Sequence, residues 1–215
     1  MKRMAVIFMA FMLLLSFGSC AKKTQPDLQD DIEQGEVTAE PFESMDISYD
    51  QFSMFKTYDS LAELTDKSDL IVIASPTKTF TDVTPALFDG NNNPVDSYEQ
   101  ASRAYCYTER DFKVYKVLKG DKNLKEVRVA ENFVKINSDG SDKIVGVEGE
   151  YIAKKNAKYL LFLVPSNYDE NLYFHCYNAG MINIDGKDPN CEQIVDQKVL
   201  NEIKKEYKNE FKEDK

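Results

Sequence analysis

The sequence predicts a mainly β domain with flanking helices (α+β), folded as a small antiparallel barrel or sandwich. A chain of 215 residues that is 42% hydrophobic can bury one main core but hardly two. Extended apolar segments recur between turn signals, roughly five to seven of them, which is typical of small antiparallel barrels and sandwiches. The only clear helical patterns lie before the first and after the last of these segments, so the helices are expected to flank the β-structure.

A short helix is expected over residues 60–67, before the first strand. Ser60 and Glu63 stand three positions apart, which is the spacing of a capping box. A second, amphipathic helix is expected at the C-terminus, because apolar residues recur there at helical spacing on a surface rich in Lys and Glu. These residues are Leu200, Ile203, Tyr207 and Phe211.

Two segments have a continuous apolar run at their centre, which predicts strands that are buried on both faces. They cover residues 69–76 and 158–165. The alternation of apolar residues and turn signals predicts the other strands at residues 104–118, 126–136, 143–152, 172–177 and 180–184. The last two are expected to pair with each other across a turn at residues 178–179.

The N-terminus has the features of an export signal. Lys2 and Arg3 precede an apolar run of 14 residues, 4–17, which suits the core of a signal peptide better than a bilayer span. The run ends in SFGSC at residues 16–20, which resembles the lipobox of bacterial lipoproteins, in which the cysteine receives a diacylglyceryl group. Two alternatives remain open: an ordinary secretory signal with an incidental cysteine, and an uncleaved membrane anchor.

The lipobox resemblance implies a lipoprotein signal peptide (1–19) and a lipidated Cys20. The acidic composition that follows predicts a flexible tether, so that 20–46 form the lipidated cysteine and tether. The remaining residues, 47–215, are expected to form a single β-barrel domain with a C-terminal helix. Removal of the signal deletes two positive charges, so the net charge changes from −10 to −12. Anionic lipid would repel such a chain, and attachment must come from two acyl chains, for example palmitate. The expected location is the extracytoplasmic face of the cell membrane.

Several motifs, taken in order, resemble a group of uncharacterised bacterial secreted lipoproteins with a netrin-like domain. They are LAEL at 61–64, SDLIV at 68–72, FKVYKVLKGD at 112–121, VRV at 127–129 and KYLLFL at 158–163. The resemblance implies a five-stranded OB-type barrel, the fold that tissue inhibitors of metalloproteinases also use. Those inhibitors chelate metal with a free N-terminal cysteine, whereas Cys20 would be acylated, so the resemblance implies the barrel and not the inhibition.

Three cysteines follow Cys20, in a chain expected to reach an oxidising compartment. A disulfide between Cys176 and Cys191 closes the shorter loop and is the pairing we favour, and Cys106 with Cys176 is the alternative. Three buried free thiols are the remaining interpretation, because cysteine is among the most buried residue types.

The polar stretch 81–103 is longer than most connections, and long loops are often binding surfaces. Within it, Asp89, Asn91, Asn93 and Asp96 alternate like the ligands of a calcium loop. The glycine and the bidentate glutamate of such a loop are missing, so a turn-rich exposed binding loop is the simpler interpretation. Neither a metal nor a cofactor is therefore predicted.

The expected function is a binding or interaction module for an unknown protein or envelope ligand. Nucleic acid is not expected as a partner, because 37 acidic residues outnumber 27 basic ones. Tyr107 and Tyr115 fall in one predicted strand, where they either contact a ligand or simply pack. One alternative is an extracytoplasmic hydrolase near His175, the only histidine, although no catalytic residue is assigned; another is an envelope structural protein without a ligand.

Overall fold

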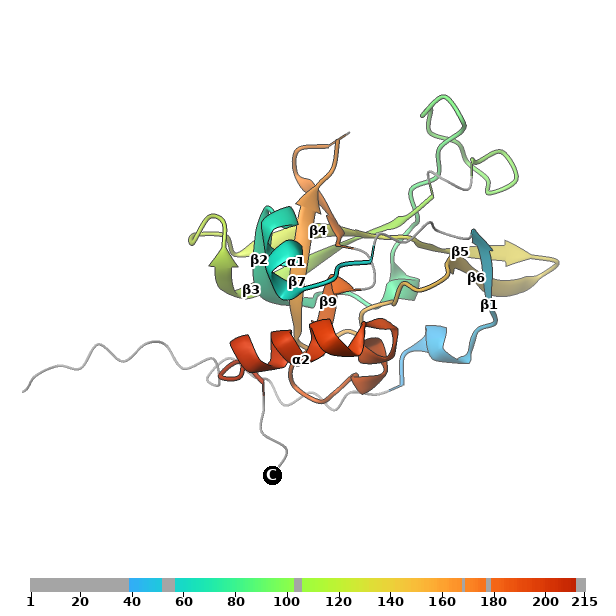
Figure 1. Cartoon of the computed structure of the whole chain (residues 1–215). Coiled ribbons are helices and arrows are strands. Elements are labelled where there is room, and N and C mark those ends of the chain that lie inside the picture. The colour runs from blue at the N-terminus through green and yellow to red at the C-terminus, as the bar shows by residue number, and fades with distance from the viewer. Residues whose placement is uncertain (1–38, 52–56, 103–105, 168, 177–178, 212–215) are drawn as a thin grey trace, which may run out of the picture. The chain divides into compact units, whose positions relative to one another are not determined.

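The computed structural model describes residues 39–51, 57–102, 106–167, 169–176 and 179–211. Its strands belong to a six-stranded and a three-stranded sheet (Figure 1). The strands are β1 (Ile47–Gln51), β2 (Leu70–Pro76), β3 (Thr108–Lys119), β4 (Glu126–Glu131), β5 (Phe133–Ser138), β6 (Ser141–Val147), β7 (Tyr159–Pro165), β8 (Leu172–His175) and β9 (Met181–Asn183).

The larger sheet closes into a five-stranded barrel. Its strands follow the order β2-β3-β4-β8-β7, and β7 pairs in turn with β2. Only the β4–β8 pair in this ring is parallel. The order is that of a Greek-key barrel of the OB type, so the predicted fold class is confirmed.

The barrel interior is filled by alternate residues of its strands, as the two-residue period of a strand requires. These residues are Leu70, Val72, Ala74, Phe112, Val114, Val127, Val129, Tyr159, Leu161 and Leu163. The intervening residues of β2 and β7, such as Ile73 and Phe162, pack outward into a second apolar core. Both strands are therefore buried on two faces, as their uninterrupted apolar sequences predicted.

Two helices cover that second core (Figure 1). Helix α1 (Leu61–Lys67) starts at Ser60, whose hydroxyl accepts a hydrogen bond of 3.3 Å from the backbone N–H of Glu63, as the capping box predicted. Helix α2 (Gln197–Glu206) starts at Asp196. Its apolar stripe packs against β7 and β9 as predicted, through Val199, Leu200, Ile203 and Tyr207. In the part of the chain that the structure describes, none of the helices has the length and apolar character needed to span a membrane.

The three-stranded sheet has the order β1-β6-β5. Strands β5 and β6 form a hairpin whose turn residues Asp139 and Gly140 have positive φ angles of 55° and 78°, as a tight hairpin turn requires. Gly146 lies opposite Phe133. A Cβ atom at Gly146 would come within 2.1 Å of the Phe133 ring, so this position needs glycine.

One predicted strand and one predicted pairing are wrong. The segment 126–136, expected as one strand, divides at Asn132 into β4 in the barrel and β5 in the smaller sheet. Strands β8 and β9 were expected to pair with each other, but both pair with β7, along different parts of its length. The reason is the length of β7, which leaves room for two short strands in line on one edge.

The folded domain also begins earlier than residue 47. Residues Pro41–Ser44 form a 3₁₀ helix, η1. Phe42 is 5% exposed and packs edge-to-face on Phe80 at 6.0 Å between ring centroids. The acidic composition of this segment suggested a tether, but one aromatic side chain and the buried Glu40 attach it to the domain.

Candidate functional site

The outer side of β3, β4 and β8 carries a group of partly exposed aromatic and charged side chains. Phe112 and Val129 face the interior, so their strands turn Tyr107, Glu109 and Arg128 to the outside. The chain between β2 and β3 borders this side, and the short connection between β7 and β8 borders it as well. Loops at these positions and the adjoining strands form the usual ligand face of OB-type barrels.

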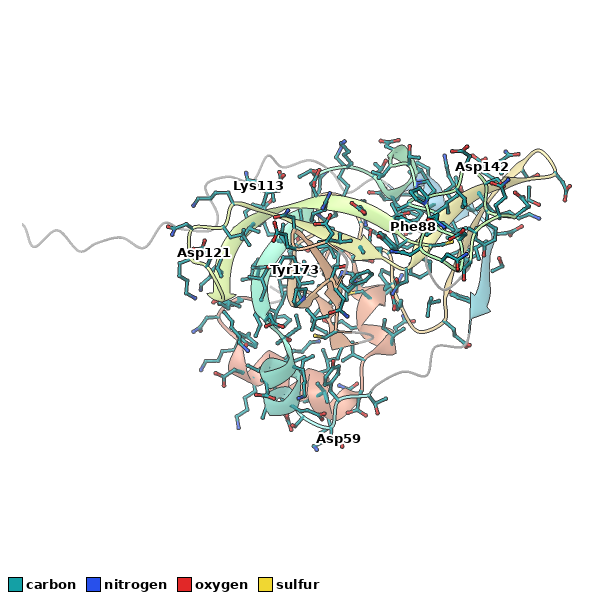
Figure 2. The ribbon with its side chains drawn as sticks, turned by 90° about the horizontal axis from the view of Figure 1, so that it is seen from above. Asp59, Phe88, Lys113, Asp121, Asp142 and Tyr173 are labelled. Atoms are coloured by element: carbon teal, nitrogen blue, oxygen red, sulfur yellow. The ribbon has the colours of Figure 1, made fainter. Side chains whose placement is uncertain are left out.

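Three aromatic rings lie in a row on this side. The Phe88 and Tyr107 rings stack with centroids 5.9 Å apart. The Tyr107 and Phe174 rings meet edge-to-face at 5.6 Å. Phe88 is held there by a β-bridge between Ala86 and Tyr107, with backbone hydrogen bonds of 2.8 and 3.1 Å. In Figure 2, Phe88 lies at the end of the barrel opposite the turn at Asp121.

A charged group adjoins the rings. The Arg128 guanidinium contacts the Glu109 carboxylate at 3.3 Å and also donates to Asp169 in the β7–β8 connection. Two carboxylates therefore face one guanidinium. We call Phe88, Tyr107, Glu109, Arg128, Asp169 and Phe174 the barrel-side site.

The charges and the rings influence each other. Burial raises the pKa of Tyr107, and the Glu109 and Asp169 carboxylates raise it further, while Arg128 opposes them. Tyr107 therefore keeps its hydroxyl proton at neutral pH and remains a hydrogen-bond donor. The buried Nε of Arg128 has no hydrogen-bond partner among the described residues. The site thus offers aromatic surface, a hydroxyl donor and an excess of negative charge.

The predicted loop residues play a different part. Oδ1 of Asp89 accepts hydrogen bonds from the backbone N–H groups of Asn91 and Asn93 at 2.8 and 2.9 Å. These bonds, chiefly those from Asn93, lower the pKa of Asp89. The Asp89 carboxylate thus folds its own loop, and Asp96 lies exposed nearby. Among the residues with described positions, no group of three or more His, Cys, Asp or Glu side chains has an arrangement suited to a metal ion.

His175 faces the barrel interior, directly opposite Leu163. Its Nε2 is buried and finds no hydrogen-bond partner in the described part of the chain. Burial lowers the pKa of His175 to about 4, helped by nearby Arg110 and opposed by Glu131. The side chain is therefore neutral at physiological pH.

Arg110 and Glu131 form a buried ion pair in the same interior, each 1% exposed. Arg110 donates from Nε and Nη2 to the two carboxylate oxygens at 2.5 and 2.6 Å. It also donates to the backbone carbonyls of Ala153 at 2.7 Å and Lys78 at 3.1 Å. Because each charged group has its partner within this cluster, the pair serves to join four segments.

The predicted disulfide is absent. Cys106, Cys176 and Cys191 are free thiols. Cys176 lies in the helix-covered core, with its sulfur 3.3 Å from the Ser68 hydroxyl, whereas Cys191 belongs to the interior core. Burial raises the pKa of all three thiols, that of Cys191 to about 12. None of them is therefore activated as a nucleophile.

Sequence patterns missed a second buried polar group, centred on Asp188. Its carboxylate accepts hydrogen bonds from the hydroxyls of Tyr159 at 2.7 Å and Tyr151 at 3.0 Å. The Lys154 ammonium lies 3.3 Å from Asp188 and 2.6 Å from Glu43. This network ties η1 to the barrel. Its members lie in three separate parts of the chain, at Glu43, within residues 151–159 and at Asp188, so no single sequence spacing marks it.

The fold and the barrel-side site define the chain as an OB-type barrel with a mixed aromatic and acidic side surface. Cys20, the predicted site of lipidation, lies outside the described residues. No protein-family model matches the chain, and no curated protein and no solved structure is significantly similar to it.

Proposed function

We propose that this chain is a bacterial lipoprotein of the netrin-like group, anchored through Cys20 at the extracytoplasmic face of the cell membrane, and that it acts as a binding module. The lipobox-like sequence SFGSC supports the anchor. The OB-type barrel supports the kinship to netrin-like domains. The barrel-side site is the proposed contact surface.

One observation carries the binding function. Five separate segments of the chain meet at the barrel-side site, and their side chains stay partly exposed although three of them are aromatic. Aromatic rings with a polar neighbour are the residues that dominate contact surfaces. A hydrolase at His175 has less support, because that ring faces the barrel interior and burial lowers its pKa to about 4, which makes it a weak base, and because burial raises the pKa of each of the three thiols.

The anchor is tested by metabolic labelling with radioactive fatty acid in the bacterium. The unaltered chain should become labelled, and Cys20→Ala should not, because the thiol is the only acceptor in the proposal. Equal labelling of both would refute the anchor. Cys106→Ala is the matched control and should retain its label.

The contact surface is tested with a photo-reactive phenylalanine analogue in the intact, anchored chain. The analogue is placed at Phe88 in one version and at Tyr49 in the other, an aromatic residue of β1 that is 53% exposed. On irradiation at the cell surface, a discrete crosslinked species is expected from position 88 and not from position 49. The same pattern from both positions, or none from position 88, would contradict the proposed surface.

A further inference from the structure

Both connections that border the barrel-side site carry more acidic than basic residues. The β2–β3 connection, residues 77–107, holds Asp82, Asp89, Asp96 and Glu99 against Lys78 and Arg103, one at each end of the acidic stretch. The β7–β8 connection, residues 166–171, holds Asp169 and Glu170 and no basic residue. The only guanidinium of the site, on Arg128, is already shared by two carboxylates. A ligand at this surface therefore meets net negative charge.

The aromatic rings of the site also favour a positively charged ligand. An ammonium or guanidinium group is attracted to the face of an aromatic ring within about 6 Å. The outer side of β3 already shows this interaction within the chain, because the Lys158 ammonium lies 4.4 Å and the Lys113 ammonium 5.3 Å from the centre of the Tyr115 ring. Phe88, Tyr107 and Phe174 place further rings beside the excess carboxylate.

The dimensions suit a polypeptide better than a small cation. Successive ring centroids are 5.9 and 5.6 Å apart, and side chains on one face of an extended peptide repeat at roughly 7 Å. An extended segment with basic residues at alternate positions can therefore place several cations along the rings and the flanking carboxylates. Phosphate-bearing and other anionic ligands would be repelled.

We infer that the barrel-side site binds an extended, Lys- or Arg-rich segment of a partner polypeptide, through its aromatic rings and the carboxylates of the two bordering connections. The inference rests on the proposed binding function and names its ligand class. It concerns association alone, and no covalent step is involved.

The test uses the full lipidated chain in non-ionic detergent and an acetylated, amidated eight-residue peptide of alternating Lys and Ser, followed by titration calorimetry. The peptide should bind saturably. The triple variant D96N/E99Q/D169N should bind roughly tenfold more weakly, since it removes three carboxylates that attract the lysines of the peptide. The variant Tyr107→Leu, which keeps every charge, should also weaken binding because it removes a ring.

The matched control is D59N/D66N/E206Q, which removes three exposed carboxylates near the helices. Figure 2 places Asp59 far from Phe88. This control should bind the peptide as the unaltered chain does. Equal weakening by both triple variants would show attraction by bulk charge and overturn the inference. Unchanged thermal midpoints show that each variant is folded.

Two further probes complete the design. A peptide with Glu in place of Lys should not bind, and binding by it would overturn the inference. Spermine should compete only weakly, and tight competition would assign the site to small polyamines instead of a polypeptide. If the photo-reactive group at position 88 crosslinks a partner whose contact segment is not basic, the proposed binding function holds and this inference fails. If no partner is crosslinked at position 88, both the proposed function and this inference fail.

Discussion

The buried Arg110–Glu131 pair makes the most direct prediction about stability. Each side chain is 1% exposed, and the pair shares two hydrogen bonds of 2.5 and 2.6 Å. Glu131→Gln keeps the shape of the side chain but leaves the Arg110 charge without a counter-charge. Leaving one partner of a buried pair uncompensated costs about 3–5 kcal/mol. For a domain of this size, that corresponds to a fall in the thermal midpoint of roughly 6–20 °C.

The companion variant Arg110→Met removes the other charge and also leaves the carbonyls of Lys78 and Ala153 without their donor. It should cost at least as much. In the double variant R110M/E131Q neither charge of this pair remains, so its loss of stability should be smaller than the sum of the two single losses by about 2 kcal/mol or more.

Urea unfolding followed by circular dichroism measures all four chains at pH 7. The control is Glu192→Gln, which breaks the more exposed pair with Lys204, 2.6 Å apart, and should cost less than about 1 kcal/mol. If Glu131→Gln behaves like Glu192→Gln, or if the two single losses simply add, Arg110 and Glu131 do not stabilise the barrel as a coupled pair.

Two further predictions concern titration and thiol chemistry. Because the pKa of folded His175 is about 4 and that of an unfolded histidine about 6.5, the unfolded chain takes up a proton first as the pH falls. Neutral His175 therefore makes its full contribution to folding stability above pH 6.5. The free energy of unfolding falls by about 3 kcal/mol as the pH is lowered toward 4. His175→Asn should remove that part of the pH dependence, and an unaltered slope would contradict it. Separately, Ellman's reagent should detect three thiols in the denatured, unreduced mature chain. In the native state only half-buried Cys106 should react readily. Detection of a single thiol in the denatured chain would show that the predicted disulfide forms after all.

The sequence predicted those elements whose local pattern has one interpretation. The apolar runs of β2 and β7 indicated burial on both faces, and the structure places the barrel interior on one side and the helices on the other. Ser60 and Glu63 marked the start of α1 because capping depends only on neighbours. Such signals are local, and tertiary packing here agrees with them.

Pairing partners could not be predicted in the same way. Residues 126–136 have strand character throughout, but nothing in a two-residue period says that the chain changes sheets at Asn132. The Asn132 side chain donates a hydrogen bond of 2.7 Å to Glu150, which lies 18 residues further along the chain. Such a tertiary contact is not visible in the local sequence pattern. Likewise, β8 and β9 are close in sequence, yet each pairs with β7 and not with the other.

The candidate site shows the same limit. The sequence singled out the long connection at residues 81–103 and, within it, Asp89, Asn91, Asn93 and Asp96. The structure gives Asp89 the local task of folding the loop and brings a neighbour, Phe88, to the barrel side. Strand alternation could have placed Tyr107 and Glu109 on one face, but only barrel closure brings Asp169 to Arg128.

Strand β3 links the interior of the barrel to the barrel-side site. Because side chains alternate along the strand, Arg110 and Phe112 point into the barrel, whereas Tyr107 and Glu109 point to the outside. Arg110 holds the carbonyl of Lys78, where the connection that carries Phe88 leaves β2, and two apolar side chains in place of the pair would leave that carbonyl without a partner. Since a buried ion pair adds little net stability over well-packed apolar residues, its value here lies in fixing the start of this connection, and with it one border of the contact surface.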